Sequence, residues 1–207
     1  MTYQALMFDI DGTLTNSQPV YATVMHQVLT EYQKPFSASD AQTTFPMAAE
    51  QAMAHLGIAA TDFDHFQARY EAVMAAHYHE IALYPGITTL MAQLPANLKL
   101  GIVTSQRRTE LEAGMQPYTF MSRMAVTISA DDTPKRKPDP LPLLTALQKV
   151  NVQPSKALFI GDSLSDEQTA AAANVDFGLA VWGMDPHANH QRTTYRFDQP
   201  TDLLKLF

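Results

Sequence analysis

The stretch "MFDIDGTLTN", residues 7–16, places Asp9 and Asp11 at the end of an apolar run and follows them with a glycine. An apolar run that ends in Asp-Gly can form a hairpin, which requires a second alternating strand directly afterwards. The next residues, "NSQPVYATVMHQVLTEYQ" (16–33), instead contain a turn cluster, a proline and apolar residues at helical spacing. The pattern therefore predicts a strand, a loop and a helix. Carboxylates at such a strand end lie where open α/β sheets bind their ligands.

Five apolar runs resemble buried parallel strands and alternate with helical patterns. The runs are "ALMFDI" (5–10), "LKLGIVTS" (98–105), "AVTISA" (125–130), "KALFIGDS" (156–163) and "FGLAVWG" (177–183). Helical stretches lie between them at 109–115, 139–150 and 166–175. This alternation is typical of a doubly wound α/β fold. We therefore expect an α/β protein with a Rossmann-like parallel sheet.

The segment from residue 15 to 84 contains helical patterns and no convincing strand. Val20, Val24 and Val28 recur at four-residue steps, and two more helical patterns follow them. Thr61 and Asp64 resemble a capping box for the last of these helices. The segment is longer than a crossover connection needs. We expect a helical cap at 15–84, inserted into an α/β catalytic core that 1–14 and 85–207 form.

Composition and charge exclude several function classes. The formal net charge is −7, with 21 acidic against 14 basic residues, so a nucleic-acid partner is not expected. The chain has no cysteine, which excludes disulfides, thiolate metal sites and cysteine catalysis. The sequence shows neither a signal-peptide pattern nor a stretch that could span a bilayer. We expect a cytoplasmic protein without a membrane partner, and the oligomeric state is left open.

Four motifs resemble those of a known enzyme family. They are Asp9-Ile10-Asp11-Gly12-Thr13-Leu14-Thr15, then Thr104-Ser105, then Lys137 of "KPDP" (137–140), and finally Gly161-Asp162-Ser163 with Asp166. In order and spacing they resemble the motifs of the haloacid dehalogenase-like phosphohydrolases. The resemblance covers essentially the whole chain, and it is strongest with the phosphoglycolate phosphatase-like subgroup that has a helical cap.

The resemblance implies different roles for the two aspartates of the first motif. Hydrolysis of a phosphate monoester needs a nucleophile and a proton donor for the leaving alkoxide. We expect Asp9 to be the nucleophile, because an aspartyl-phosphate splits one difficult displacement into two easier steps. We expect Asp11 to act first as general acid and then as general base for the hydrolytic water.

A metal ion is expected beside the nucleophile, because a carboxylate that attacks a phosphate needs a cation between the like charges. Mg²⁺ suits this role, since it takes oxygen ligands and accepts substrate phosphate oxygens. We expect its ligands to be the carboxylates of Asp9 and Asp162 and the backbone carbonyl of Asp11. Asp166 is expected to hold a metal-bound water or to support the ligands.

Three further residues are expected to bind the phosphate. Thr104 offers a hydroxyl, Ser105 a backbone amide and Lys137 a compact positive charge. Taken singly, Thr104-Ser105 is more often a helix N-cap, and a lysine in a basic cluster is usually solvated. Their joint placement with the aspartates favours the phosphate-binding interpretation.

Several functions stay open within this chemistry. A dehalogenase needs no acid for its leaving halide, so Asp11 favours a phosphatase. A sugar-phosphate mutase, a pyrophosphatase and a non-catalytic phosphate-binding module remain alternatives. The expected substrate is a small phosphorylated metabolite, with phosphoglycolate as one candidate. The chain has Gln106 where the subgroup usually has lysine.

Discrimination among leaving groups is expected to come from the cap. Phe45, Pro46 and Met47 precede a predicted helix and offer two large apolar side chains without charge. The alternative is that Phe45 and Met47 pack inside the cap, as large apolar residues commonly do. His187 and His190 lack a third metal ligand nearby in the sequence and are expected at the surface.

Overall fold

A computed structural model describes residues 3–47 and 49–207. The chain divides into two compact units. The first unit contains the chain up to Asn16 together with Leu83–Phe207, and the second is Ser17–Ala82. These divisions lie within a few residues of the boundaries expected from the sequence. Two short strands, β2 (Thr15–Asn16) and β3 (Ala82–Leu83), form a small sheet of their own. The expectation that residues 15–84 contain no strand is therefore wrong at the two ends of that segment, where strands of two residues are too short to give a sequence pattern.

The first unit is built on a six-stranded sheet in the order β5-β4-β1-β6-β7-β8, in which every pairing is parallel. The bounds are β1 (Ala5–Phe8), β4 (Lys99–Val103), β5 (Met124–Ile128), β6 (Ala157–Gly161), β7 (Asp176–Ala180) and β8 (Tyr195–Phe197). The five predicted strands are confirmed, although most end before the polar residues that the apolar runs included. The expected α/β class with a Rossmann-like parallel sheet is therefore confirmed.

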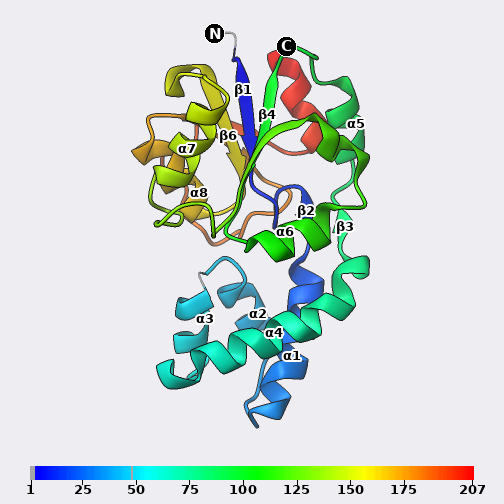
Figure 1. The fold of residues 1–207 in the computed structure, drawn as a ribbon, viewed down its shortest axis with the longest axis vertical. Helices are drawn as coiled ribbons and strands as arrows, with labels where there is room; N and C mark the ends of the chain where they lie inside the picture. The colour runs from blue at the N-terminus through cyan, green and yellow to red at the C-terminus, as the bar shows by residue number, and fades with distance from the viewer. Residues whose placement is uncertain (1–2, 48) are drawn as a thin grey trace. The chain divides into compact units, whose positions relative to one another are not determined.

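Helices cover both faces of this sheet (Figure 1). One face carries α7 (Leu141–Lys149), which packs on β4 and β5, and α8 (Leu164–Ala172), which packs on β6 and β7. The other carries α5 (Ile87–Gln93), α6 (Arg108–Met115) and the 3-10 segments η3 (Thr119–Arg123) and η5 (Pro200–Leu206). A further 3-10 turn, η4 (Pro154–Lys156), precedes β6.

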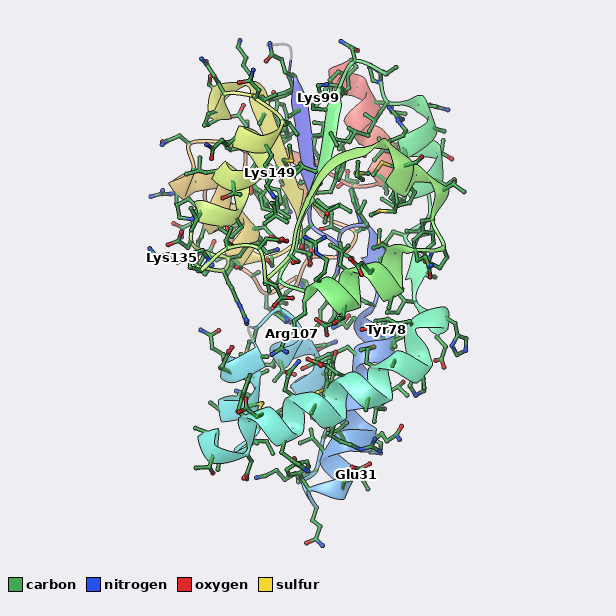
Figure 2. All side chains as sticks on the ribbon, viewed as in Figure 1. Glu31, Tyr78, Lys99, Arg107, Lys135 and Lys149 are labelled. Carbon is green, nitrogen blue, oxygen red and sulfur yellow. The ribbon has the colours of Figure 1, made fainter. Side chains whose placement is uncertain are left out.

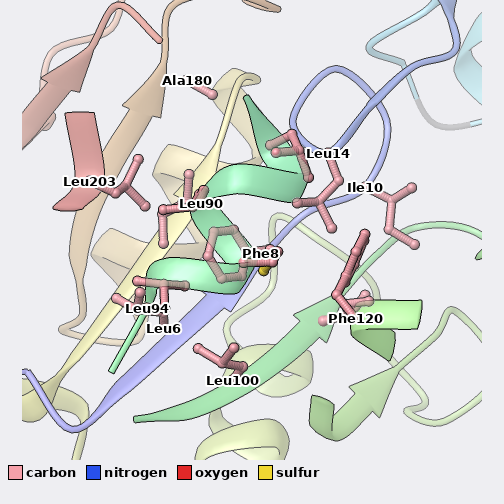
Figure 3. Packing of buried hydrophobic residues seen from close by; sticks show 14 of the residues in the cluster. Leu6, Phe8, Ile10, Leu14, Leu90, Leu94, Leu100, Phe120, Ala180 and Leu203 are labelled. Atoms are coloured by element: carbon pink, nitrogen blue, oxygen red, sulfur yellow. The ribbon is translucent and has the colours of Figure 1, made fainter. Parts of the chain in front are cut away.

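The strands are buried on both faces, which explains their nearly continuous apolar sequences. Leu6 and Phe8 of β1 point into one cluster with Leu90 of α5 and Leu203 of η5 (Figure 3). Met7, between them in the sequence, belongs to the opposite cluster beneath α7 and α8. Because successive side chains of a strand alternate between faces, β1 contributes to both cores and is held at the centre of the sheet.

The second unit is helical. Its elements are α1 (Gln18–Glu31), α2 (Ala38–Thr44), α3 (Ala49–His55), η1 (Ala60–Asp62), α4 (Phe63–His77) and η2 (Tyr78–Glu80). The predicted valine stripe of α1 is buried against α4. The predicted capping box at Thr61 is wrong, because residues 60–62 form η1 and α4 begins only at Phe63. No helix in the described part of the chain is long and apolar enough to cross a membrane.

Candidate active site

The predicted motif residues meet at the carboxyl edge of the three central strands. Asp9 follows β1, Thr104 follows β4 and Asp162 follows β6, and β1 lies between the other two strands. The backbone N–H of Asp9 donates to the carbonyl of Ile160 in β6 (2.9 Å). Parallel strands place their carboxyl ends at one edge, so residues far apart in the sequence become neighbours.

Lys137 reaches this edge from the loop between β5 and α7. Its Nζ donates to Asp9 Oδ1 (2.8 Å) and to Asp166 Oδ1 (2.6 Å). The Lys137 side chain is only 4% exposed, unlike Lys99 and Lys149, which are solvent-exposed (Figure 2). Burial alone would lower the pKa of Lys137, but Asp166 and Asp9 raise it above its usual value. Lys137 is therefore a fixed positive charge, and the interpretation as a solvated lysine is wrong.

Asp9, Asp162 and Asp166 form a buried acidic cluster. One carboxylate oxygen from each lies within 4.8 Å of the others, a spacing at which they can hold a metal ion. Burial raises the pKa of Asp9 to about 7, and Lys137 only partly opposes this effect. Burial and the charge of Asp166 also raise the pKa of Asp162 well above its usual value. The cluster therefore needs further positive charge to stay ionised, and its all-oxygen donor set suits a hard divalent cation such as Mg²⁺.

Asp162 is held by the loop that follows Asp11. Thr13 Oγ1 donates to Asp162 Oδ1 (2.8 Å). Gly12 has a φ of +80°, and a Cβ at this position would lie 2.1 Å from Asp162 Oδ2. Only glycine combines this backbone conformation with so close an approach. The loop and the carboxylate therefore fit together through a glycine and a hydroxyl that the first motif supplies.

A second segment braces the same loop from the end of β7. The indole Nε1–H of Trp182 donates to the carbonyl of Thr13 (2.9 Å). At Gly183 a Cβ would lie only 1.7 Å from the carbonyl oxygen of Gly12, so this position also requires glycine. Trp182 thus holds the backbone of the residue whose hydroxyl holds Asp162.

Asp166 lies in the first turn of α8 and is completely buried. Its Oδ1 accepts from Lys137, and its Oδ2 accepts from the N–H and hydroxyl of Ser163 (3.1 and 2.6 Å). Ser163 Oγ in return accepts from the Asp166 N–H, which completes a capping box. Both carboxylate oxygens of Asp166 are therefore engaged by protein donors, an arrangement that suits a supporting role.

The other predicted site residues of the α/β unit follow β1 and β4. Gln106 Nε2 donates to Asp11 Oδ2 (2.8 Å), and the Gln106 N–H donates to Thr104 Oγ1 (3.1 Å). Thr104 is buried, whereas Ser105 is exposed. Their predicted roles in binding phosphate stay predictions, as does the role of Asp11 in proton transfer.

The predicted specificity residues belong to the helical unit. Phe45 follows α2, and its ring packs edge-on against Tyr21 with ring centroids 5.4 Å apart. Pro46 is exposed, and Phe45 and Met47 are partly buried. The function of these three residues stays a prediction.

Sequence reasoning assigned no supporting contact to four residues that hold the site together: Thr13, Gln106, Ser163 and Trp182. The S-x-x-D pattern of Ser163 and Asp166 was a local signal for its capping box. The contacts of Trp182 and Gln106 join distant segments and had no such signal. The expected surface position of His190 is wrong, because its side chain is 2% exposed and stacks on Phe177 with ring centroids 6.3 Å apart.

Comparisons with known proteins agree with the motifs. The family model for haloacid dehalogenase-like hydrolases matches residues 6–180. A phosphoglycolate phosphatase of Xanthomonas campestris is 30% identical, with 87% of this chain and 84% of that protein covered. An N-acetylmuramic acid 6-phosphate phosphatase of Pseudomonas putida is 28% identical, with 100% of this chain and 96% of that protein covered.

A crystal structure from Lactobacillus plantarum is 76% identical, with a TM-score of 0.97 over the full length of both chains. That protein carries a provisional assignment as a phosphoglycolate phosphatase. The activity class expected from the motifs, a phosphatase, is thus the one that the curated relatives carry in their names. The family match spans most of the chain, and the protein belongs to the haloacid dehalogenase-like hydrolases.

Proposed function

We propose that the protein is a Mg²⁺-dependent phosphomonoester hydrolase that acts through an aspartyl-phosphate on a small phosphorylated metabolite. The observation that carries the proposal is the buried contact of Asp9 with Lys137, beside the carboxylates of Asp162 and Asp166. A nucleophilic carboxylate needs positive charge close by to approach a phosphate dianion. Lys137 provides one such charge at 2.8 Å from Asp9 Oδ1.

In the first step an Asp9 carboxylate oxygen attacks phosphorus, and the bond from phosphorus to the ester oxygen breaks. Asp11 gives its proton to the departing alkoxide, which leaves as an alcohol. In the second step water attacks the phosphorus of the aspartyl-phosphate and passes a proton to Asp11. Inorganic phosphate leaves, and both aspartates return to their starting states.

The carboxylates of Asp9 and Asp162 and the backbone carbonyl of Asp11 would hold Mg²⁺. When bound, the ion supplies charge that reduces repulsion between the nucleophile and the phosphate. Thr13 fixes Asp162 by its hydrogen bond. Asp166 fixes Lys137 through Oδ1, and its Oδ2 accepts from Ser163, so both of its oxygens already have protein donors. Outer partners of this kind orient the groups that do the chemistry.

Phosphate binding falls to Thr104, Ser105 and Lys137. The Thr104 hydroxyl and the Ser105 amide lie at the end of β4, next to β1 in the sheet. The charge on Lys137 counters the negative charge on the phosphate oxygens and separates Asp9 from Asp166, because its Nζ contacts both. Thr104 and Ser105 follow directly on a strand of the sheet, and the buried Lys137 is held by two carboxylates, so little reorganisation is needed as the transition state forms.

Phosphoglycolate is one substrate candidate, because several curated relatives are named for that activity. The name of the Pseudomonas putida relative points to a larger sugar phosphate. We infer that the helical unit acts as a cap on the core and that Phe45, Pro46 and Met47 contribute to the choice of leaving group. Because the proposed substrate is a small phosphorylated metabolite, we propose that the enzyme acts in the cytoplasm, where such esters are formed.

The test is phosphate release from a panel of esters that includes phosphoglycolate, sugar phosphates and an aryl phosphate. We expect turnover with Mg²⁺, none with excess chelator and recovery when Mg²⁺ is restored. Asp162→Asn should require much more Mg²⁺, whereas Asp198→Asn, a change at an exposed carboxylate of the same unit, should behave as wild type. Full activity in chelator would contradict the metal requirement, and inactivity on every ester would contradict the hydrolase assignment.

A further inference from the structure

Gln106 occupies a fixed position at the end of β4. Its backbone N–H donates to Thr104 Oγ1 (3.1 Å), and its carbonyl accepts from the N–H of Ala130 (2.8 Å), which follows β5. The backbone of Gln106 is therefore tied to two neighbouring strand ends. A side chain that leaves such a backbone has few positions open to it.

The two ends of the Gln106 amide have very different surroundings. Nε2 donates to Asp11 Oδ2 at 2.8 Å. Oε1 is buried and, among the described residues, finds no hydrogen-bond donor. The opposite orientation of the amide would bring Oε1 against the negative carboxylate of Asp11. The contact with Asp11 therefore fixes the amide, even though it leaves an acceptor unpaired.

An unpaired buried acceptor lowers the stability of a protein, because the group has lost its bonds to water. An apolar side chain of similar size at position 106 would avoid this loss. The fold alone therefore does not account for a glutamine here. The hydrogen bond to Asp11, the residue assigned to proton transfer, is the one feature of this amide that apolar residues cannot supply.

We propose that Gln106 is a positioning residue for Asp11, an inference that rests on the proposed function. By donating to Oδ2, the amide holds the carboxyl group in one orientation and makes Oδ1 the oxygen that carries the transferable proton. That proton moves from Oδ1 to the ester oxygen as the bond to phosphorus breaks. In the second step a proton from water returns to Oδ1. Gln106 itself neither gains nor loses a proton in either step.

The test compares two kinds of ester in the Gln106→Leu variant. An alkyl phosphate leaves as a strongly basic alkoxide and needs the proton, whereas p-nitrophenyl phosphate leaves as a weakly basic phenolate and needs it much less. We expect kcat/KM to fall about 10²-fold for the alkyl ester. The fall for the aryl ester should be several-fold smaller, and most of the loss should appear in kcat. The melting temperature should stay the same or rise.

Gln148→Leu is the matched control, because Gln148 is exposed on α7. It should leave both esters unaffected. An equal loss on the two esters with a lower melting temperature would show a purely structural role for Gln106 and overturn the inference. Unchanged rates on both esters would overturn it as well.

Asp11→Asn separates the inference from the function on which it rests. If Asp11→Asn shows the alkyl-selective loss and Gln106→Leu does not, the inference fails and the proposed function stands. If Asp11→Asn shows no such selectivity, the role of Asp11 in the proposed function is wrong. If the inference on Gln106 and the role of Asp11 are both right, the variant that combines Gln106→Leu with Asp11→Asn should lose little more kcat/KM than Asp11→Asn alone, because the two residues act as one unit.

Discussion

The two units of the molecule treat charge in opposite ways. The α/β unit buries Asp9, Asp162 and Asp166 together with Lys137 at the edge of its sheet. Among the described residues of Ser17–Ala82, the buried polar side chains are hydroxyls and none is charged. Its ion pairs, such as Arg69 with Glu31, lie at the surface. Glu31 is labelled in Figure 2. Because burying charge is costly, a buried cluster of several charges indicates a candidate functional site.

This difference in buried charge indicates that the two units have different functions. The α/β unit contains the candidate reactive groups, and their chemistry needs charges at fixed distances. The helical unit contains an apolar core formed by side chains such as Val24, Met53 and Phe66. A unit of this kind can vary its surface without disturbing the reaction. Such freedom suits the proposed role of a cap that selects the leaving group.

The largest expected effect comes from breaking a buried ion pair. Lys137→Met should lower kcat/KM by about 10³-fold, because it removes the charge beside Asp9. It should also lower the free energy of unfolding by about 3–5 kcal/mol, since the buried carboxylates of Asp9 and Asp166 lose their positive partner. Arg69→Met, which breaks an exposed pair in the helical unit, should change both quantities little. Steady-state kinetics and urea unfolding measure the two variants, and equal effects would contradict the contrast between the units.

A second effect concerns pH and stability. Burial raises the pKa of Asp9 from 3.8 to about 7, so folding favours the protonated carboxyl. Its stabilising contribution is complete below about pH 4 and is lost as the pH rises through about 7. In chelator, the melting temperature of the wild type should therefore fall between about pH 4 and about pH 7.

Asp9→Asn should flatten that fall and melt at least about 2–4 °C above the wild type at pH 8, the shift that about 1 kcal/mol gives in a chain of this size. Asp198→Asn should follow the wild-type curve, because Asp198 is exposed. Calorimetry across the pH range decides the matter. Parallel curves for wild type and Asp9→Asn would mean that Asp9 carries no burial penalty.

A smaller effect is expected at the brace formed by Trp182. Trp182→Phe keeps an aromatic ring but removes the donor to the carbonyl of Thr13. The Mg²⁺ concentration for half-maximal activity should rise about 10-fold, because Thr13 orients Asp162. Tyr195→Phe in edge strand β8 is the control and should leave the metal requirement unchanged. A lower melting temperature with an unchanged Mg²⁺ requirement would show that Trp182 contributes to packing alone and not to metal binding.

The smallest effect on the reaction itself is expected from the helical unit. Replacing Phe45 and Met47 with alanine should reorder the panel of esters by kcat/KM while leaving hydrolysis of a small aryl phosphate nearly unchanged. The proposed cap role assigns these two residues to the leaving group and leaves the phosphate to the core. A uniform loss across all esters, together with a lower melting temperature, would show that the two residues are core. That result would remove their predicted role in specificity.

Much of the α/β unit could be predicted, because its signals are local. An apolar run that ends in Asp9 or Asp162 contains both the strand and the polar edge within a few residues. Strand β8 was missed because Tyr195–Phe197 is short and places an arginine between two aromatic residues. A buried parallel strand is recognised by a longer apolar run.

The supporting contacts could not be predicted, because they depend on how distant segments come together. Thr13 and Asp162 are 149 residues apart in the sequence, and Trp182 and Thr13 are 169 apart. Nothing near Gln106 indicates that its amide reaches Asp11, and nothing near His190 indicates that Phe177 covers its ring. Motifs predict which groups react, whereas the residues that hold them follow only from the fold.

The central claim is that Asp9 becomes phosphorylated during turnover, and peptide mapping by mass spectrometry after a rapid acid quench tests it most directly. With Mg²⁺ and a substrate ester, one phosphoryl group should appear on the peptide that contains Asp9. It should disappear in chelator and in Asp9→Asn, and it should accumulate in Asp11→Asn if loss of the general base slows the second step. A phosphoryl group on another residue, or normal turnover by Asp9→Asn, would contradict the account.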